Sequence, residues 1–394
     1  MLFNNKYSLK SRLFRSHWLC LLLSFAIVGF QPFGDSPDQP EVLFIAYDQG
    51  ESNAFLELRK TLTQNFISYR VIAFGRASEI FNDHSSQAGI SKDRQQQLKQ
   101  SRNNELSASE LQNIIQSINP KIVYSGMSSI IQAQLMNAFK DKGTYTIAFY
   151  DNFDPIIGKE YVQPFLSNVN PPDEYHIPSN STRTSFYDQP TFAQSALNVS
   201  GNPALETWDS VYQKTDENTI RQELKIKKNQ PIVVFAGGYD NTYEAYLRVF
   251  IDATRLMPSI RFLITYHPKT EGKLEKSIVR ELAANNVQVI EKGTYSTTEL
   301  SKLSEAVAVH KSSIGAQALY KNKPVLFVAE PEFTNFLIQK QLASLASSPE
   351  QVKNKLLSVI KADKHSSGLS RIGVPEKPSQ TITDLLLLKL RGSR

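Results

Sequence analysis

The sequence predicts an α/β protein with two Rossmann-like parallel-sheet domains that face each other across a cleft, preceded by a hydrophobic segment. Three observations lead to this prediction. Short apolar runs typical of buried strands alternate with stretches of helical periodicity. Polar or glycine-containing turns follow many of the apolar runs, as at the carboxyl ends of parallel strands. The alternation starts again at Ile232, and 394 residues are enough for two domains of ordinary size.

The first series of apolar runs predicts an N-terminal domain over residues 41–205. Its strands are expected at 42–46, 69–74, 121–124, 144–150, 174–177 and 197–201. Its helices are expected at 54–62, 107–118 and 130–139, where apolar residues recur at helical spacing. Residues 48–53 are expected to form a turn, and 80–104 is a polar insertion. A doubly wound sheet follows from this alternation of strands and helices.

The second series predicts a C-terminal domain over residues 206–375, followed by a C-terminal helix in 376–394. Its strands are expected at 232–236, 261–266, 287–290, 306–309 and 324–328. Its helices are expected at 215–224, 242–257, 274–285, 296–303 and 314–320, and the last helix of the chain at 385–390. Gly237 and Gly238 form a glycine turn directly after the first of these strands. The same alternation therefore predicts a second parallel sheet.

The first 40 residues predict a signal peptide or an uncleaved membrane anchor. Basic residues precede the apolar run Trp18–Phe30, which has the length of a signal-peptide core, and acidic residues follow it. This charge order predicts that the rest of the chain is exported, or anchored with its bulk outside the cytoplasm. A bulk on the cytoplasmic side, against this charge rule, stays open as an alternative.

Composition excludes several classes of function. The net charge of +6 is spread along the chain without a basic block, which argues against nucleic-acid binding. Cys20 is the only cysteine and lies in the apolar segment, so neither predicted domain has a disulfide or a cysteine-ligated zinc site.

The segment Val307–Val328 shows most clearly how a site could be built. A strand is followed by the turn His310–Ser313, then by a helix that Ser312 or Ser313 could cap, and then by another strand. Free backbone N–H groups, serine hydroxyls and a lysine at a helix N-terminus suit a phosphate group. An ordinary capped helix without a ligand is the structural alternative.

Four segments resemble motifs of sugar-nucleotide enzymes with the GT-B fold. DQGESNAFL resembles their acceptor-side loop, and VSGNPALETW resembles the segment entering the second domain of non-hydrolysing UDP-N-acetylglucosamine 2-epimerases. TYHPKT is similar to the His-Pro motif of bacterial sialyl- and polysialyltransferases and of glycerophosphotransferases, and HKSSIGAQAL to their Ser-Ser motif. The resemblance covers roughly residues 41–360 and implies the GT-B fold, with an acceptor-side first domain and a donor-binding second domain.

This resemblance also implies which residues meet the substrates. The donor phosphate, sugar or base would be held by Gly237, Gly238, His267, Lys269, His310, Ser312, Ser313 and Gln317. Gln317 stands about where many GT-B enzymes carry a glutamate for the ribose hydroxyls, and a neutral amide is a weaker acceptor. Asp151 and Asp48 are the candidates for the base that deprotonates an acceptor hydroxyl, with Asp154 third. Helix caps and turns are the simpler explanation of these carboxylates.

The implied function is a GT-B glycosyltransferase. It would transfer a sugar, or a sugar or polyol phosphate, from a nucleotide-activated donor to a glycan or lipid-linked acceptor. No metal or cofactor is expected, because helix N-termini and cationic side chains can meet the phosphate charge. Two alternatives remain. One is a non-hydrolysing sugar-nucleotide 2-epimerase of the same fold, suggested by GNPALETW. The other is an exported two-domain solute-binding protein without catalysis, since TIAFYDNFDPIIG resembles a hinge-side loop of that class.

Overall fold

A computed structural model describes residues 39–81, 89–156, 160–166, 170–189, 196–267, 269–361 and 368–392. The hydrophobic run predicted to be a signal or anchor lies outside these described residues. Among the residues that the structure describes, no helix is long and apolar enough to cross a membrane. The membrane association and the predicted domain bounds therefore stay predictions.

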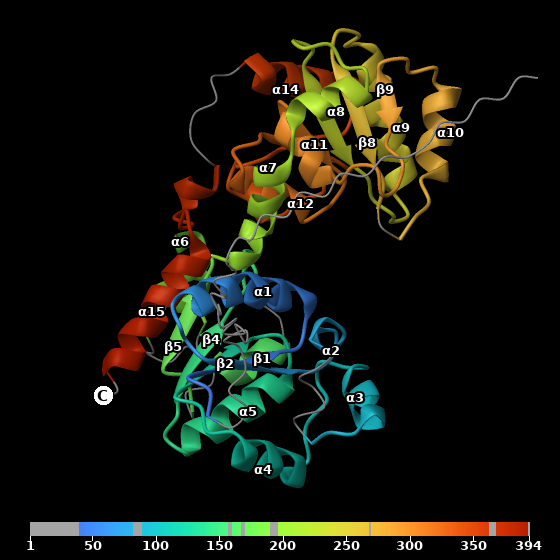
Figure 1. The fold of residues 1–394 in the computed structure, drawn as a ribbon. Coiled ribbons are helices and arrows are strands. Elements are labelled where there is room, and N and C mark those ends of the chain that lie inside the picture. Colours follow the sequence, from blue (N-terminus) through green and yellow to red (C-terminus); the bar gives the residue numbers. More distant parts are fainter. Residues whose placement is uncertain are drawn as a thin grey trace, which may run out of the picture. The chain divides into compact units, whose positions relative to one another are not determined.

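Six parallel strands form the first sheet (Figure 1). They are β1 (Val42–Ala46), β2 (Tyr69–Ala73), β3 (Ile122–Gly126), β4 (Tyr145–Phe149), β5 (Glu174–Ile177) and β6 (Ala196–Val199), in the order β2-β1-β3-β4-β5-β6. Every residue of β1 is buried, as expected for a parallel strand that is covered on both faces. The strands predicted for the first series are all found, within a few residues at their ends.

The second sheet also has six parallel strands. They are β7 (Ile232–Ala236), β8 (Arg261–Thr265), β9 (Val287–Val289), β10 (Ala306–Val309), β11 (Val325–Val328) and β12 (Ser344–Ala346), in the order β12-β11-β10-β7-β8-β9. Strand β12 was not predicted. Its three residues, two of them half-buried, are too few to give a periodic signal.

Each sheet has one topological switch point, where the chain reverses its direction of travel across the sheet. In the first sheet the chain passes from β1 to β2 and then returns to place β3 on the other side of β1. In the second sheet β7 has β8 on one side and β10 on the other. Ligands of open parallel sheets bind outside the carboxyl ends of the strands at such a point. The residues that follow β1, β3, β7 and β10 are therefore the first to consider for function.

Helices cover both faces of the first sheet. One core cluster places α4 (Ala108–Ser117) and α5 (Ile130–Asp141) against the sheet through side chains such as Ile114 and Phe139. The opposite cluster joins α1 (Gln49–Gln64) to α15 (Pro378–Gly392). The remaining helices of this part are α2 (Ala77–Ile80), α3 (Lys92–Leu98) and α6 (Asn180–Tyr187).

The second sheet is covered in the same way. Side chains of α9 (Tyr243–Arg255), α10 (Lys273–Glu281) and α14 (Pro349–Lys361) form one core cluster with its strands. Two further hydrophobic core clusters pack helices against other side chains of the same strands. One contains α8 (Glu217–Glu223) and α11 (Thr297–Leu303), and the other contains α12 (Ile314–Tyr320) and α13 (Phe336–Gln339). The remaining helix, α7 (Asp209–Lys214), follows the 3₁₀ segment Pro203–Trp208.

The C-terminal helix packs on the first sheet although it follows the second sheet in the chain (Figure 1). Thr383 of α15 hydrogen-bonds Thr61 of α1 over 2.8 Å between their hydroxyl oxygens, and Lys389 forms an ion pair with Glu174 at the start of β5. The helix begins at Pro378, seven residues before its predicted start, because proline is accepted in the first turn of a helix. The prediction of its start was therefore wrong.

The predicted turn at 48–53 was also wrong, since α1 begins at Gln49. Asp48 is the N-cap, and its side chain and the Glu51 side chain satisfy each other's backbone N–H groups in a capping box. A capping box pairs a cap residue with a glutamate or glutamine three positions later, and the spacing of Asp48 and Glu51 therefore marks a helix start. This shift moves Gly50 and Glu51 from a loop into the first turn of a 16-residue helix.

Candidate functional site

The switch point of the second sheet borders a cavity of about 530 Å³. Its lining includes the predicted site residues Gly237, His267, Ser312 and Ser313, together with Thr265 at the end of β8. Gly238 lines a neighbouring cavity of about 480 Å³, with Tyr239 and Asp240. The fold thus gathers predicted donor residues from three separate turns at the carboxyl ends of β7, β8 and β10.

Ser312 and Ser313 carry hydroxyls that the fold hardly uses. Ser312 is half-buried, and its oxygen accepts one long bond of 3.3 Å from the backbone N–H of Ile314. Ser313 is exposed and occupies the N-cap of α12 in a helical backbone conformation, without a side-chain cap bond. Ser313 thus stands at the predicted cap position, but its hydroxyl makes no cap bond. Both side chains remain candidates for contact with a ligand.

His267 stands beside an exposed aromatic ring. The ring of Tyr239, which is 57% exposed, lies 4.2 Å from the His267 ring, and the Lys269 ammonium lies 4.8 Å from the Tyr239 centroid. Burial, and then the charge of Lys269, lower the pKa of His267. A neutral imidazole and a largely exposed aromatic ring are suited to hydrogen bonding and stacking with a planar ligand.

Gly237 and Gly238 have a packing reason to be glycine. A Cβ atom on Gly237 would lie 2.9 Å from the carbonyl oxygen of Thr265, and one on Gly238 would lie 2.8 Å from the ring of His310. Both glycines are buried, so close packing of the turn explains them without a ligand. Their role toward a donor stays a prediction.

His310 and Gln317 are bound to other parts of the protein. His310 is buried; its Nδ1 lies 2.8 Å from the carbonyl oxygen of Val328, and its Nε2 lies 3.1 Å from Asp240. Burial would raise the pKa of Asp240, but hydrogen bonds from His310 and Thr242 outweigh it and lower the pKa to about 2. Gln317 donates a 3.1 Å bond to the hydroxyl of Thr207. Both side chains therefore have a structural use that the sequence did not reveal.

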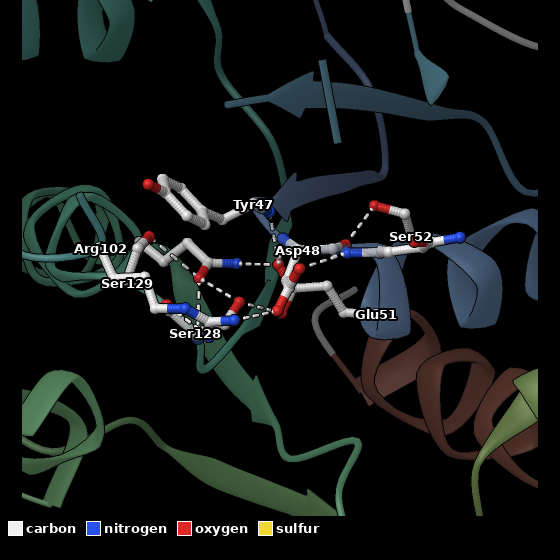
Figure 2. Close-up of polar contacts among 9 residues, drawn as sticks. Tyr47, Asp48, Glu51, Ser52, Arg102, Ser128 and Ser129 are labelled. Carbon is white, nitrogen blue, oxygen red and sulfur yellow. Dashed lines mark hydrogen bonds and ion pairs between the residues drawn. The ribbon is translucent and has the colours of Figure 1, made fainter. Parts of the chain in front are cut away.

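The switch point of the first sheet holds a connected group of polar side chains, drawn in Figure 2. Asp48 accepts a bond of 2.8 Å from the backbone N–H of Gln49 and forms an ion pair with Arg102. Arg102 also donates to the carbonyl oxygen of Ser128 over 3.3 Å and lies 4.7 Å from the ring centroid of Tyr161. Asp48 is thus a helix cap whose charge is already paired, which makes it a weak candidate for a base.

Asp151, the other candidate for the base, follows β4. It is half-buried, and a Cβ atom built on Gly50 would overlap its carboxylate, so this carboxylate lies against the first turn of α1. The positive end of the helix dipole favours a negative charge there. Asn202 donates a bond of 2.7 Å to the backbone carbonyl of Asp151, which ties the turn to the segment after β6. Asp154 is exposed, farther along the same turn.

Glu51 is a buried polar residue that no sequence pattern singled out as a site residue. Its carboxyl group is 1% exposed and lies between the N-terminus of α1 and the turn after β3. The backbone N–H of Asp48, the hydroxyl of Ser128 and the Gln132 amide of α5 are within hydrogen-bond distance of it. The capping-box spacing after β1 was the signal that could have found it. Only the fold, however, shows that the turn after β3 closes over it.

The comparisons with known proteins concern the fold. No family model matches the chain, and no curated protein sequence matches it. Among solved structures it is similar to the Neisseria meningitidis UDP-GlcNAc 2-epimerase, with 17% identity over 88% of this chain and 99% of that one, and a TM-score of 0.54. The UDP-GlcNAc 2-epimerase of Methanocaldococcus jannaschii has 10% identity over 88% of this chain and 99% of that one, with a TM-score of 0.61. A glycosyltransferase of Rickettsia africae has 13% identity over 90% of this chain and 97% of that one, with a TM-score of 0.55.

These similarities confirm the predicted resemblance to sugar-nucleotide enzymes of the GT-B type and the two-sheet α/β fold. At 10–17% identity they show the fold and not the activity.

Proposed function

We propose that this chain is a metal-independent GT-B glycosyltransferase that uses a nucleotide-activated sugar as donor. One observation carries the proposal: the two switch points offer complementary chemistry. The second presents little-used serine hydroxyls and a histidine around one cavity, which suits a phosphate and a base. The first presents the half-buried carboxylate of Asp151, which suits removal of a proton from an acceptor hydroxyl. Similar solved structures with bound UDP-GlcNAc or UDP support such a donor.

Binding of the donor is the first test. The full chain is titrated with a panel of nucleotides and nucleotide sugars, starting with UDP and UDP-N-acetylhexosamines, and heat release or change in melting temperature is measured. We expect saturable binding of at least one of them. A folded sample that binds none of them would contradict the proposal.

A sugar-nucleotide 2-epimerase is the second candidate, and the names of several similar structures favour it. The two activities differ in their need for an acceptor. An epimerase acts on the donor alone and exchanges the hydrogen at C2 of the sugar with solvent. Incubation with UDP-N-acetylhexosamines in deuterated water distinguishes them: deuterium at C2 identifies an epimerase, and its absence together with donor binding supports a transferase.

The acceptor and the location are proposals that rest on the sequence. We propose a glycan or a lipid-linked acceptor, with residues 1–40 bringing the enzyme to a membrane or through it. Protease treatment of intact cells and sequencing of the mature N-terminus test this location. An intact N-terminus on a chain found only in the soluble cytoplasmic fraction would contradict it.

A further inference from the structure

The hydrogen bonds around Glu51 distinguish its two oxygens. Oε1 accepts from three N–H groups: the backbone N–H of Tyr47, the backbone N–H of Asp48 at 2.9 Å, and the side-chain amide of Gln132 at 2.8 Å. Backbone N–H groups can only donate. Oε1 is therefore fully occupied as an acceptor and has no room for a proton.

The orientation of the Gln132 amide is set by its other partners. Its oxygen lies 2.9 Å from the backbone N–H of Ser128, which must donate, and its nitrogen lies 2.9 Å from the carbonyl oxygen of Ile45, which must accept. The amide nitrogen therefore faces Glu51 as a donor. This arrangement removes the usual ambiguity between the two ends of a glutamine amide.

Oε2 of Glu51 has a different partner. It lies 2.7 Å from the hydroxyl of Ser128, and a hydroxyl can donate or accept. A Cβ atom on Gly126 would overlap Oε2, so the carboxyl group fills the space that this glycine leaves. If Oε2 carries a proton, it donates to Ser128, and Ser128 turns its own hydrogen to the Gln132 oxygen, 3.2 Å away. The network is then complete with a neutral Glu51.

The charges near Glu51 favour that neutral form. Among the described residues Glu51 has no ion-pair partner; Arg102, the nearby cation, is paired with Asp48. The other titratable groups that face this network are Asp151 after β4, Tyr47 at the end of β1 and Tyr161. Burial, and then the charge of Asp151, raise the pKa of Glu51 to about 8, against the lowering effect of its hydrogen-bond donors.

We propose that Glu51 is protonated in the folded protein and acts as a positioning residue, holding the α1 N-terminus to the turn after β3 and leaving Asp151 as the ionised carboxylate of this site. Two carboxyl groups with one proton divide it according to their surroundings. Glu51 is fully enclosed, whereas Asp151 is half-buried at the positive end of α1. The role of Asp151 as the base rests on the proposed function; the location of the proton does not.

The test locates the proton without any substrate. The full chain is labelled with ¹³C at the side-chain carboxyls of glutamate and aspartate, and the carboxyl signals are followed from pH 5 to pH 9. The signals of Glu51 and Asp151 are identified by their loss in Glu51→Gln and Asp151→Asn. At pH 6.5 we expect the Glu51 signal in its protonated position and the Asp151 signal in its ionised position. An ionised Glu51 or a protonated Asp151 at that pH would overturn the proposal.

Thermal melts provide the second measurement, with Glu174→Gln as the matched control. Glutamine at position 51 keeps an oxygen for the three N–H donors and offers an N–H to Ser128, so it imitates the protonated acid. Because the pKa of Glu51 is raised by folding, its contribution is fully present below its unfolded pKa of about 4.5 and is lost as the pH rises toward about 8. The melting temperature of the wild type should therefore fall relative to Glu51→Gln as the pH rises from 5 to 9. A pH-independent difference, with the variant always lower, would mean that Glu51 is ionised.

Glu51→Gln could fail to fold, and Ser128→Ala covers that case. Loss of the hydroxyl removes the partner of Oε2 only, so it should shift the titration of one high-pKa glutamate signal in the labelled protein and leave the others in place. No shifted signal in folded Ser128→Ala would overturn the assignment of the proton to Oε2. Absence of donor binding would refute the proposed function but would leave these results unaffected.

Discussion

The two switch points of this protein occupy equivalent places in two similar sheets. They differ in how many of their polar side chains are already hydrogen-bonded within the protein. At the first, Asp48, Glu51 and Ser128 are bound to partners within the protein, and Asp151 lies at their edge. At the second, the hydroxyls of Ser312 and Ser313 are almost unused. Polar side chains that already have hydrogen-bond partners in the protein fix the local geometry. Polar side chains that the fold hardly uses can bind a ligand without loss of stability. The first edge is therefore held by its own hydrogen bonds, whereas the second edge leaves two serine hydroxyls available to a ligand.

Replacing the proposed base should give the largest effect. Asp151→Asn keeps the shape of the side chain but removes its basicity, so turnover should fall by about 10²- to 10⁴-fold, as is typical of general-base removal. The affinity for the donor should stay nearly unchanged, because the donor is expected at the other switch point. Steady-state kinetics and a donor titration on the same variant measure both. If donor affinity falls as strongly as turnover, the division of labour between the two edges is wrong.

Removing the open hydroxyls should weaken donor binding. Ser312→Ala/Ser313→Ala should cost roughly 1.5–3 kcal/mol of binding, about a ten- to hundredfold rise in Kd, because each hydroxyl would meet a charged phosphate. The melting temperature should change little, since Ser313 makes no side-chain cap bond and Ser312 accepts only one long bond of 3.3 Å from Ile314 of α12. His267→Ala should also raise the Kd for the donor.

Ser107→Ala is the matched control for the serine variant. Ser107 caps α4 in a capping box, so its replacement should destabilise the protein by about 0.5–2 kcal/mol and leave the donor Kd unchanged. A serine double variant that behaves like this control would show that the turn after β10 is structural.

A buried glutamate away from both edges should respond to pH in the opposite sense to Glu51. Burial would raise the pKa of Glu174, but hydrogen bonds from His176, Lys389 and Tyr145 outweigh it and lower the pKa to about 2. The stability that Glu174 contributes is therefore present above its unfolded pKa of about 4.5 and is lost as the pH falls toward 2. Melts of wild type and Glu174→Gln should converge between pH 4.5 and 2.

The same variant should be destabilised at pH 7, by about 1.5–3 kcal/mol, because it loses hydrogen bonds to an ionised carboxylate. Chemical unfolding at pH 7 measures this difference. Equal stability at pH 7 would mean that the ion pair with Lys389 contributes nothing to the attachment of α15.

The smallest effect is expected at Gln317. Its amide is bound to Thr207, so Gln317→Ala should cost about 1 kcal/mol of stability and change the donor Kd by less than about twofold. A tenfold loss of donor affinity, measured in the same titration, would instead support the predicted contact with the ribose.

The positions of some candidate residues in the fold could be predicted from the sequence because the signals there are local. Ser312 and Ser313 follow a clear strand, and Asp151 follows another, so parallel-sheet geometry alone places them at carboxyl edges. Glu51 could not be assigned in the same way. Its surroundings come from β1, α1 and the turn after β3, and contacts between such distant segments leave no periodic trace in the chain.

The sequence by itself determined the alternation of strands and helices, the two series and the turns that hold the predicted donor residues, because these depend on neighbours a few residues apart. Only the tertiary structure decided which polar groups are already bound: His310 to Asp240, Gln317 to Thr207, Asp48 to Arg102 and Glu51 to Ser128. It also decided that α15 returns to the first sheet. The physical reason is that burial and hydrogen-bond pairing depend on segments brought together by folding, and the same side chain can bind a ligand or stabilise the fold according to what lies beside it.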